Sequence, residues 1–150
     1  MNIIPVIEAA KRGNEDQIAE LIRNGANPNK CDSTGCNALH WAAGGGHNAA
    51  VSVLIRHRCD VNKQNLNGDT PLHKAAWKRH PQCVQLLLNA GANRDIENKE
   101  GKPPLMLVRD IETRKLLVPP IEGTFYLFPS RTIFFILLGS DDEMEDEDSD

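Results

Sequence analysis

The chain repeats itself with a period of 33 residues. Residues of the same or similar type recur at this spacing along most of the sequence. The recurring positions are Pro5, Ala38, Pro71 and Pro104; Gly35, Gly68 and Gly101; Leu39, Leu72 and Leu105; His40 and His73; Ala9, Ala42 and Ala75; and Leu21, Leu54 and Leu87. A fixed period of this length is typical of stacked units that each contact only their neighbours. We therefore expect a repeat domain over 1–118, with units at about 2–31, 35–64 and 68–97 and a shortened unit at 101–118.

Each unit reads as a turn followed by two short helices. In the third unit Thr70 supplies a side-chain oxygen that suits an N-cap, and Pro71 takes the first helical position, where its missing N–H costs nothing. A second helix is expected to open at Pro81. The apolar residues Val84, Leu87 and Leu88 follow it at spacings of i, i+3 and i+4, which place them on one face of a helix. Gly91 is expected to end that helix in a left-handed conformation. These are the local signals of a helix-turn-helix unit.

Three units depart from this pattern. The first has no preceding turn and reads as a terminal cap. The second has Asn37 at the N-cap and Arg58 where its neighbours have glycine, so its second helix is expected to end less cleanly. The fourth reaches its second helix, 112–117, about three residues early, and Pro119 with Pro120 then stops helical structure.

The segment 70–76, Thr-Pro-Leu-His-Lys-Ala-Ala, fits the ankyrin signature T-P-L-H-x-A, and 37–43 is a close variant. The sequence resembles the ankyrin-repeat family over about residues 2–118. The resemblance implies an all-α solenoid of stacked helix-turn-helix units joined by β-turns. It also implies a protein-protein interaction module (an adaptor, scaffold or inhibitor) rather than an enzyme, with no cofactor.

Members of that family bind partners on the concave side of the stack, through turn tips and first helices. Mapped by repeat position, the expected partner-binding residues are Lys11, Arg12, Ser33, Thr34, Cys36, Leu66, Asn67, Asp69, Trp77, Lys78, Lys99, Glu100 and Lys102. Trp77 is the expected anchor, since interface hot spots favour Trp and Arg; the alternative is a half-buried stacking residue. Trp41 is expected to pack between units. The resemblance also marks Asn62 as a hydroxylation candidate, although the same residue is explained as a turn residue.

Metal binding and catalysis find little support. The five histidines and four cysteines do not assemble into a zinc-finger spacing, because Cys31 and Cys36 have no second pair. His40 and His73 are signature residues, which in this family hydrogen-bond within the turn and cap region. No phosphate loop or nucleophile elbow is present. The N-terminus shows no signal peptide, so free thiols in a reducing compartment are expected.

Residues 119–150 differ in composition from the repeats. Residues 141–150 hold eight acidic side chains and no basic ones, which leaves 17 basic and 13 acidic residues in the remaining chain. Residues 140–150 are expected to be disordered, and Ser140 is a phosphorylation candidate beside acidic residues. The mild basic excess of the remainder is too small to predict nucleic-acid binding.

The apolar block 125–138 spans fourteen residues and is interrupted by Pro129 and Arg131, whereas a membrane-spanning helix needs about 20 apolar residues. Within it, 133–138 is a strand or aggregation candidate. The block either packs on the last unit, docks a partner, or belongs to a variant C-terminus without a fold of its own. The alternative function is accordingly a membrane- or lipid-associated regulator.

The third and fourth units also resemble the N-terminal ankyrin segment of long oxysterol-binding-protein-related proteins, which recruits a small GTPase of late endosomes. This narrower resemblance implies a fragment or short relative of a sterol-binding protein. The expected partner is thus a protein, with a small GTPase as one possibility. The chain is expected to be a monomer in the cytoplasm and also in the nucleus, or at the late-endosomal surface if the narrower resemblance holds.

Overall fold

A computed structural model describes residues 3–118, 125–127 and 133–135. The chain divides into two compact units, 1–117 and 118–150. The acidic segment 140–150, with Ser140, lies outside the described residues, and so does most of the apolar block 125–138.

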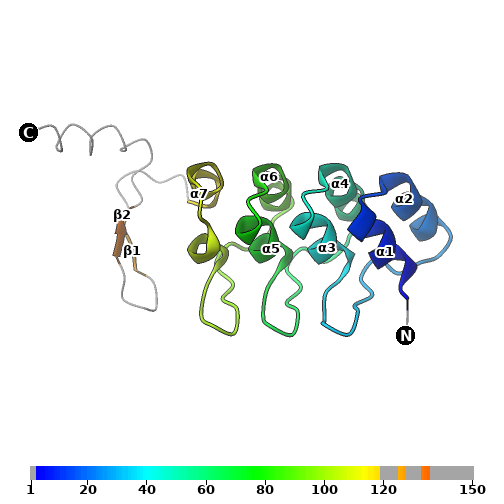
Figure 1. The fold of residues 1–150 in the computed structure, drawn as a ribbon, viewed down its shortest axis with the longest axis horizontal. Coiled ribbons are helices and arrows are strands. Elements are labelled where there is room, and N and C mark those ends of the chain that lie inside the picture. Colours follow the sequence, from blue (N-terminus) through cyan, green and yellow to red (C-terminus); the bar gives the residue numbers. More distant parts are fainter. Residues whose placement is uncertain (1–2, 119–124, 128–132, 136–150) are drawn as a thin grey trace, which may run out of the picture. The chain divides into compact units, whose positions relative to one another are not determined.

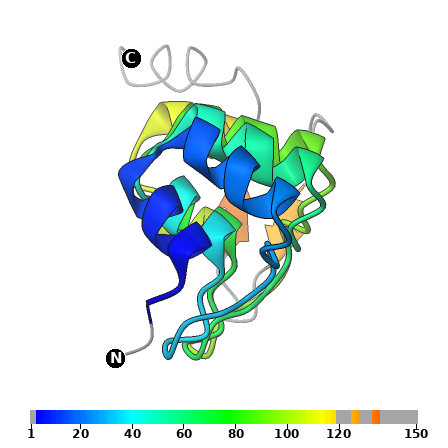
Figure 2. The same cartoon turned by 90° about the vertical axis from the view of Figure 1, so that its right-hand side faces the viewer.

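The repeat unit consists of paired short helices. They are α1 (Pro5–Arg12) with α2 (Glu15–Arg23), α3 (Ala38–Gly44) with α4 (Asn48–Arg56), α5 (Pro71–Trp77) with α6 (Pro81–Asn89), and the 3-10 helix η1 (Pro104–Leu107) with α7 (Ile111–Leu117). First helices form one layer and second helices form the other, with the connecting turns projecting beyond the first layer (Figure 1). Viewed along the stack, successive turns project in the same direction (Figure 2). The predicted all-α solenoid is confirmed for this part of the chain.

Small and aliphatic side chains build the core. Ala9, Ala42 and Ala75 are fully buried and occupy the same place in successive units, so the first helices approach each other closely. Leu39 and Leu72 are also fully buried, and each such leucine stabilises the fold by about 1.5–3 kcal/mol. Closely packed first helices leave little room for aromatic side chains, which agrees with the low aromatic content of the repeats.

Reciprocal caps start the first helices of the two central units. The Thr70 hydroxyl accepts a hydrogen bond from the His73 backbone N–H, while the His73 ring accepts one from the Thr70 backbone N–H at 3.0 Å. Asn37 and His40 make the same pair of bonds, at 2.9 and 3.1 Å. The predicted N-caps Thr70 and Asn37 are confirmed.

The predicted irregular end of α4 is wrong. Arg58 adopts φ 64°, in the left-handed region that Gly25 and Gly91 occupy in neighbouring units. The backbone bonds that close the helix form normally, since Arg58 N–H reaches the Ile55 carbonyl at 3.0 Å and the next N–H reaches the Leu54 carbonyl at 3.0 Å. Arg58 adopts the unfavourable left-handed backbone conformation, and α4 ends with the same backbone hydrogen bonds as α2.

The fourth unit is shortened as expected, with a change of helix type. Its first helix, η1, is 3-10 rather than α. Asp110 caps α7, because its carboxylate accepts a hydrogen bond from the Thr113 backbone N–H at 2.9 Å. The helix begins at Ile111, one residue before the predicted start.

The second compact unit contains two short strands, β1 (Phe125–Leu127) and β2 (Ile133–Phe135). They pair antiparallel, with Phe125 opposite Phe135 and Leu127 opposite Ile133. The strand β2 falls within the segment 133–138, for which strand was one predicted alternative. Among the described residues, no helix has the length and apolar character needed to cross a membrane.

Candidate interaction groove

Three turns with the same internal bonding separate successive units. Asn65 organises the second of them, since its side-chain oxygen accepts hydrogen bonds from the backbone N–H groups of Asn67 (2.9 Å) and Asp69 (3.0 Å). Asp32 and Asn98 occupy the equivalent positions and accept the same pair of bonds in their own turns. A side chain that bonds its own turn in this way fixes the turn conformation.

Hydrogen bonds also join each turn to the next. The Leu66 N–H donates to the Thr34 carbonyl, and the Lys99 N–H donates to the Asn67 carbonyl, both at 3.0 Å. These bonds hold the turn tips side by side in a row. The turns are therefore parts of one rigid surface rather than independent loops.

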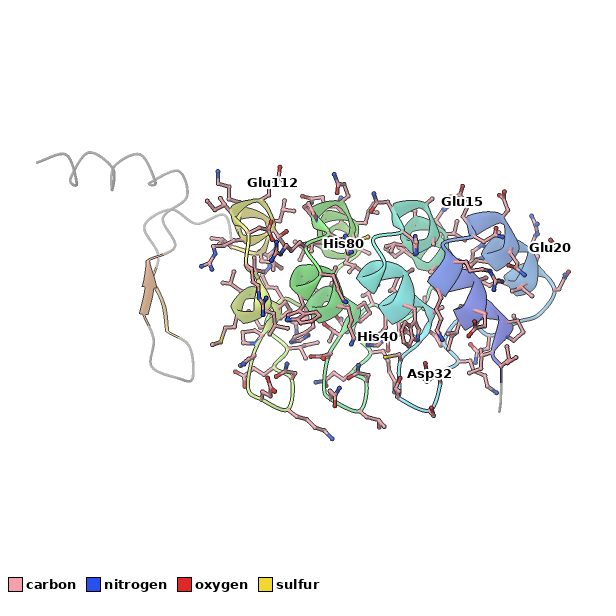
Figure 3. The ribbon with its side chains drawn as sticks, viewed as in Figure 1. Glu15, Glu20, Asp32, His40, His80 and Glu112 are labelled. Atoms are coloured by element: carbon pink, nitrogen blue, oxygen red, sulfur yellow. The ribbon has the colours of Figure 1, made fainter. Side chains whose placement is uncertain are left out.

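The signature histidines connect the first helices to these turns. With its Nδ1 accepting from the cap, His40 donates from Nε2 to the Asp69 carbonyl at 2.8 Å, and His73 donates likewise to the Lys102 carbonyl. Burial lowers the pKa of His40 to about 4 and also lowers the pKa of His73, outweighing the bonds to these carbonyls that favour the charged ring. Both imidazoles are thus neutral near pH 7. Figure 3 shows His40 at the start of its helix and Asp32 in the preceding turn.

We use the name groove for the surface between the turns (32–36, 65–69 and 98–102) and the facing sides of α1, α3, α5 and η1. Two hollows indent it over α3 and α5. One, of about 410 Å³, is lined by Asn67, Asp69, His73, Lys74, Trp77, Asn98, Lys99, Glu100 and Leu107. The other, of about 390 Å³, is lined by Lys11, Cys36, His40, Trp41, Gly44, Gly45, Lys74 and Lys78. Lys74 borders both hollows, which are therefore neighbours along the groove.

Trp77 is the exposed aromatic residue of the groove. It is 45% exposed at the end of α5. The Lys78 ammonium lies 5.0 Å from its ring centroid and the Arg109 guanidinium lies 5.9 Å away, within range of cation–π attraction. The ring is therefore held by cations while much of its surface remains open to a partner.

Trp41 has a different setting in the second hollow. Its indole N–H donates to the Asp32 carboxylate at 2.9 Å, and the ring packs partly against the core. Burial would raise the pKa of Asp32, but hydrogen bonds from Thr34, Trp41 and Cys36 outweigh it and lower the pKa. Trp41 thus packs into the stack as predicted and also lines the groove, which the sequence did not indicate.

Eight of the thirteen predicted partner-binding residues line these two hollows, namely Lys11, Cys36, Asn67, Asp69, Trp77, Lys78, Lys99 and Glu100. Ser33 lines another hollow with Lys11. Arg12 and Thr34 are exposed, Leu66 is 62% exposed on a turn tip, and Lys102 pairs with Glu100 at 3.3 Å. Cys36 is only 4% exposed, and its sulfur accepts a hydrogen bond from the Asn65 amide, so its main contacts are internal. Binding by these residues stays a prediction.

Several residues that line the hollows were not predicted, among them Trp41, Lys74 and Leu107, and neither was Arg109, which lies beside Trp77. Lys74 is the variable residue of the T-P-L-H-x-A signature, and Trp41 and Leu107 occupy the same place in adjacent units. A position that varies inside an otherwise repeated motif was the available signal. Arg109 had no comparable signal, because the shortened fourth unit shifts its register.

Asn62 lies at a junction between units. Its side-chain oxygen accepts a hydrogen bond from the Asn93 N–H at 2.8 Å, just as Asn29 accepts one from Asp60 at 2.6 Å. This geometry supports the interpretation as a turn residue. Hydroxylation of Asn62 stays a prediction.

All four cysteines are free, as expected. Burial raises the pKa of Cys59 to about 12 and that of Cys83 to about 11, which suits packing rather than metal ligation. Across 3–118 and the two strands, no group of three potential ligand residues comes together.

The sequence was compared with models of protein families and with curated proteins. A family model described as ankyrin repeats (3 copies) matches residues 6–100. No curated protein matches the chain.

Proposed function

Because the chain belongs to the ankyrin-repeat family, whose repeats are in general protein-protein interaction modules, we propose that it binds a protein partner in the groove. The role is that of an adaptor, scaffold or inhibitor. The family is in general non-enzymatic, and we extend that to this chain.

The observation that carries the proposal is the exposure of Trp77 on a rigid frame. A tryptophan ring that is 45% exposed leaves apolar surface in water, and covering it with a partner is favourable. Trp and Arg dominate interface energetics, and here Trp77 has Arg109 beside it. Leu66, exposed on a turn tip, adds a second apolar contact at the groove's edge.

A rigid frame reduces the entropy lost on binding. The turn tips are joined to each other by backbone hydrogen bonds, and His40 and His73 join them to the first helices. Groups that are already ordered lose less freedom when a partner docks, so more of the contact energy appears as affinity. The internal bonding of the turns therefore supports recognition as well as stability.

The test is photo-crosslinking in cell extract. A photoreactive phenylalanine analogue replaces Lys99, an exposed turn residue in the groove, or Gln85, an exposed residue of α6 in the other helix layer. We expect an adduct with a specific protein from position 99 and none from position 85. Trp77→Ala is expected to remove the adduct, while the matched change Gln82→Ala on α6 leaves it intact. Equal adducts from both positions, or an adduct that survives Trp77→Ala, would contradict the proposal.

The finer predictions remain open to separate tests. A small GTPase partner, the kinship with sterol-binding proteins, and cytoplasmic, nuclear or late-endosomal placement all stay predictions, as does a monomeric state. Membrane or lipid association through 125–138 is tested by vesicle sedimentation of the full chain and of a chain lacking 121–150. Equal sedimentation of the two would remove that alternative.

A further inference from the structure

The rows of side chains along the groove are interrupted at one place. The position held by Lys11 in α1 and by Trp77 in α5 is Gly44 in α3. The next position, held by Arg12 in the first unit and Lys78 in the third, is Gly45. Two side chains that neighbouring units possess are therefore missing side by side in the second unit.

This gap forms the hollow of about 390 Å³. A methyl group added at Gly44 would meet only the Cβ of Lys74, at 3.7 Å, which is ordinary contact. Beneath the gap, Trp41 is fixed by the bond from its indole N–H to Asp32, and Cys36 and His40 close the floor. The hollow thus has a preformed apolar floor large enough for a side chain.

The walls of the hollow are basic. Its charged lining consists of Lys11, Lys74 and Lys78, and it includes no carboxylate. Lys11 pairs with Glu8 at 3.2 Å, whereas Lys74 and Lys78 form no salt bridge within the described part of the chain. The Asp32 carboxylate nearby accepts bonds from Trp41 and from its own turn. The Lys74 and Lys78 ammonium groups therefore have no carboxylate partner among the described residues, although that of Lys78 also lies over the Trp77 ring.

The floor itself is unsuited to an anion. Gly44 is the last residue of α3, and the C-terminal end of a helix carries partial negative charge. A carboxylate is favoured at the rim, beside the lysines. An apolar side chain is favoured in the gap beside Trp41, whose ring also has the Lys11 ammonium 4.5 Å from its centroid. The hollow therefore favours an apolar group at its floor and a carboxylate at its rim.

We propose that the hollow over Trp41 recognises an acidic segment of the partner protein that carries one exposed apolar side chain. The apolar side chain enters the gap left by Gly44, since the His47 ring already fills the space beside Gly45, and flanking carboxylates pair with Lys74 and Lys78. This rests on the proposed function, because it assigns the partner's chemistry at the same groove.

The test measures binding of a fluorescein-labelled peptide in which one leucine has three glutamates on each side. Gly44→Leu fills the hollow with an apolar side chain, and Gly44→Ala is its matched control. We expect Gly44→Leu to weaken binding about tenfold or more, because it removes the apolar burial site. Gly44→Ala leaves affinity within about twofold, since a methyl group fits there. Circular dichroism melting shows whether each variant remains folded.

Charge is tested separately. The double change Lys74→Gln and Lys78→Gln is expected to weaken binding about tenfold at low salt, and added salt should weaken binding to the unsubstituted chain. Peptides with lysine in place of glutamate, or alanine in place of leucine, should bind at least about fivefold less tightly. Because residues 141–150 hold eight acidic groups that would compete for the same lysines, every titration is repeated with those groups changed to amides.

The inference is overturned if neither form of the chain binds the acidic peptide, if the lysine peptide binds as well, or if Gly44→Leu has no effect. An adduct at position 99 that depends on Trp77, together with any of these results, leaves the proposed function standing and removes only the acidic specificity. If the chain with Trp77 intact forms no such adduct, or if the adduct persists after Trp77→Ala, the proposed function itself is removed.

Discussion

The ring of His80 packs against Gly46 so closely that its Nδ1 lies 2.6 Å from the place a Cβ on that glycine would occupy. His47 packs in the same way on Gly13, one unit earlier. The third unit has Arg79 at this position, and the N-cap of the next unit's second helix is Asp110 rather than a histidine. A side chain is therefore present at this position only where the next unit has no histidine at its N-cap.

Gly46→Ala is expected to destabilise the fold by about 2 kcal/mol, because alanine must adopt a left-handed φ of 72° and also displace the His80 ring. Urea denaturation measures the change. A double-mutant cycle with His80→Ala isolates the steric part, and the double variant should lose less stability than the two single changes together. Additive effects would show that the close packing of His80 on Gly46 contributes nothing.

Arg58→Gly is expected to stabilise the protein by about 1 kcal/mol. Arg58 is held at φ 64°, which is costly for a residue with a Cβ and free for glycine. Arg56→Gly, at the last residue of α4, is the control and should destabilise by up to about 1 kcal/mol. A Tm that falls with both changes would show that the Arg58 side chain makes contacts worth more than its strain.

The sequence predicted most of the frame because the frame is locally encoded. Thr70 with Pro71 starts a helix, Gly91 ends one, and three buried alanines recur at the repeat spacing, so each signal is read within a few residues. Arg58 shows the limit of such signals: the stack imposes a left-handed conformation on a residue that does not favour it.

The groove was less predictable than the frame. Turn tips and Trp77 follow from repeat position, but Trp41 acquires its role only because Gly44 leaves space above it. Arg109 reaches Trp77 from the shortened unit, where the repeat spacing no longer applies. The roles of Trp41 and Arg109 depend on how deeply each side chain is buried and on which side chains surround it. The spacing of the repeats does not predict either property.

Stability is expected to fall as the pH is lowered from 7 toward 4. The pKa of His40 is lowered by burial to about 4 from an ordinary value near 6.5, so the unfolded chain binds a proton in this window before the folded chain does. His40 alone accounts for a loss of at most about 3 kcal/mol, complete near pH 4 and absent above 6.5. His73, whose pKa is also lowered, adds to it. Urea midpoints at pH 7, 6 and 5 measure the slope, and NMR should find the His40 imidazole neutral at pH 6; a protonated His40 ring at that pH would contradict the prediction.

Thiol reactivity should separate Cys31 from the other cysteines. Cys31 is partly exposed, whereas Cys36, Cys59 and Cys83 are buried in the stack. The thiolate is the reactive form, and burial raises the pKa of Cys59 and Cys83 while also blocking access. An aromatic disulfide reagent at pH 8 should therefore modify one thiol quickly in the native chain and all four in denaturant. Cys31→Ser should remove the fast phase. Because the slow thiols react only when neighbouring units separate, their rates report the opening of the stack, and a second fast thiol would mean that one of the junctions is open in the native protein.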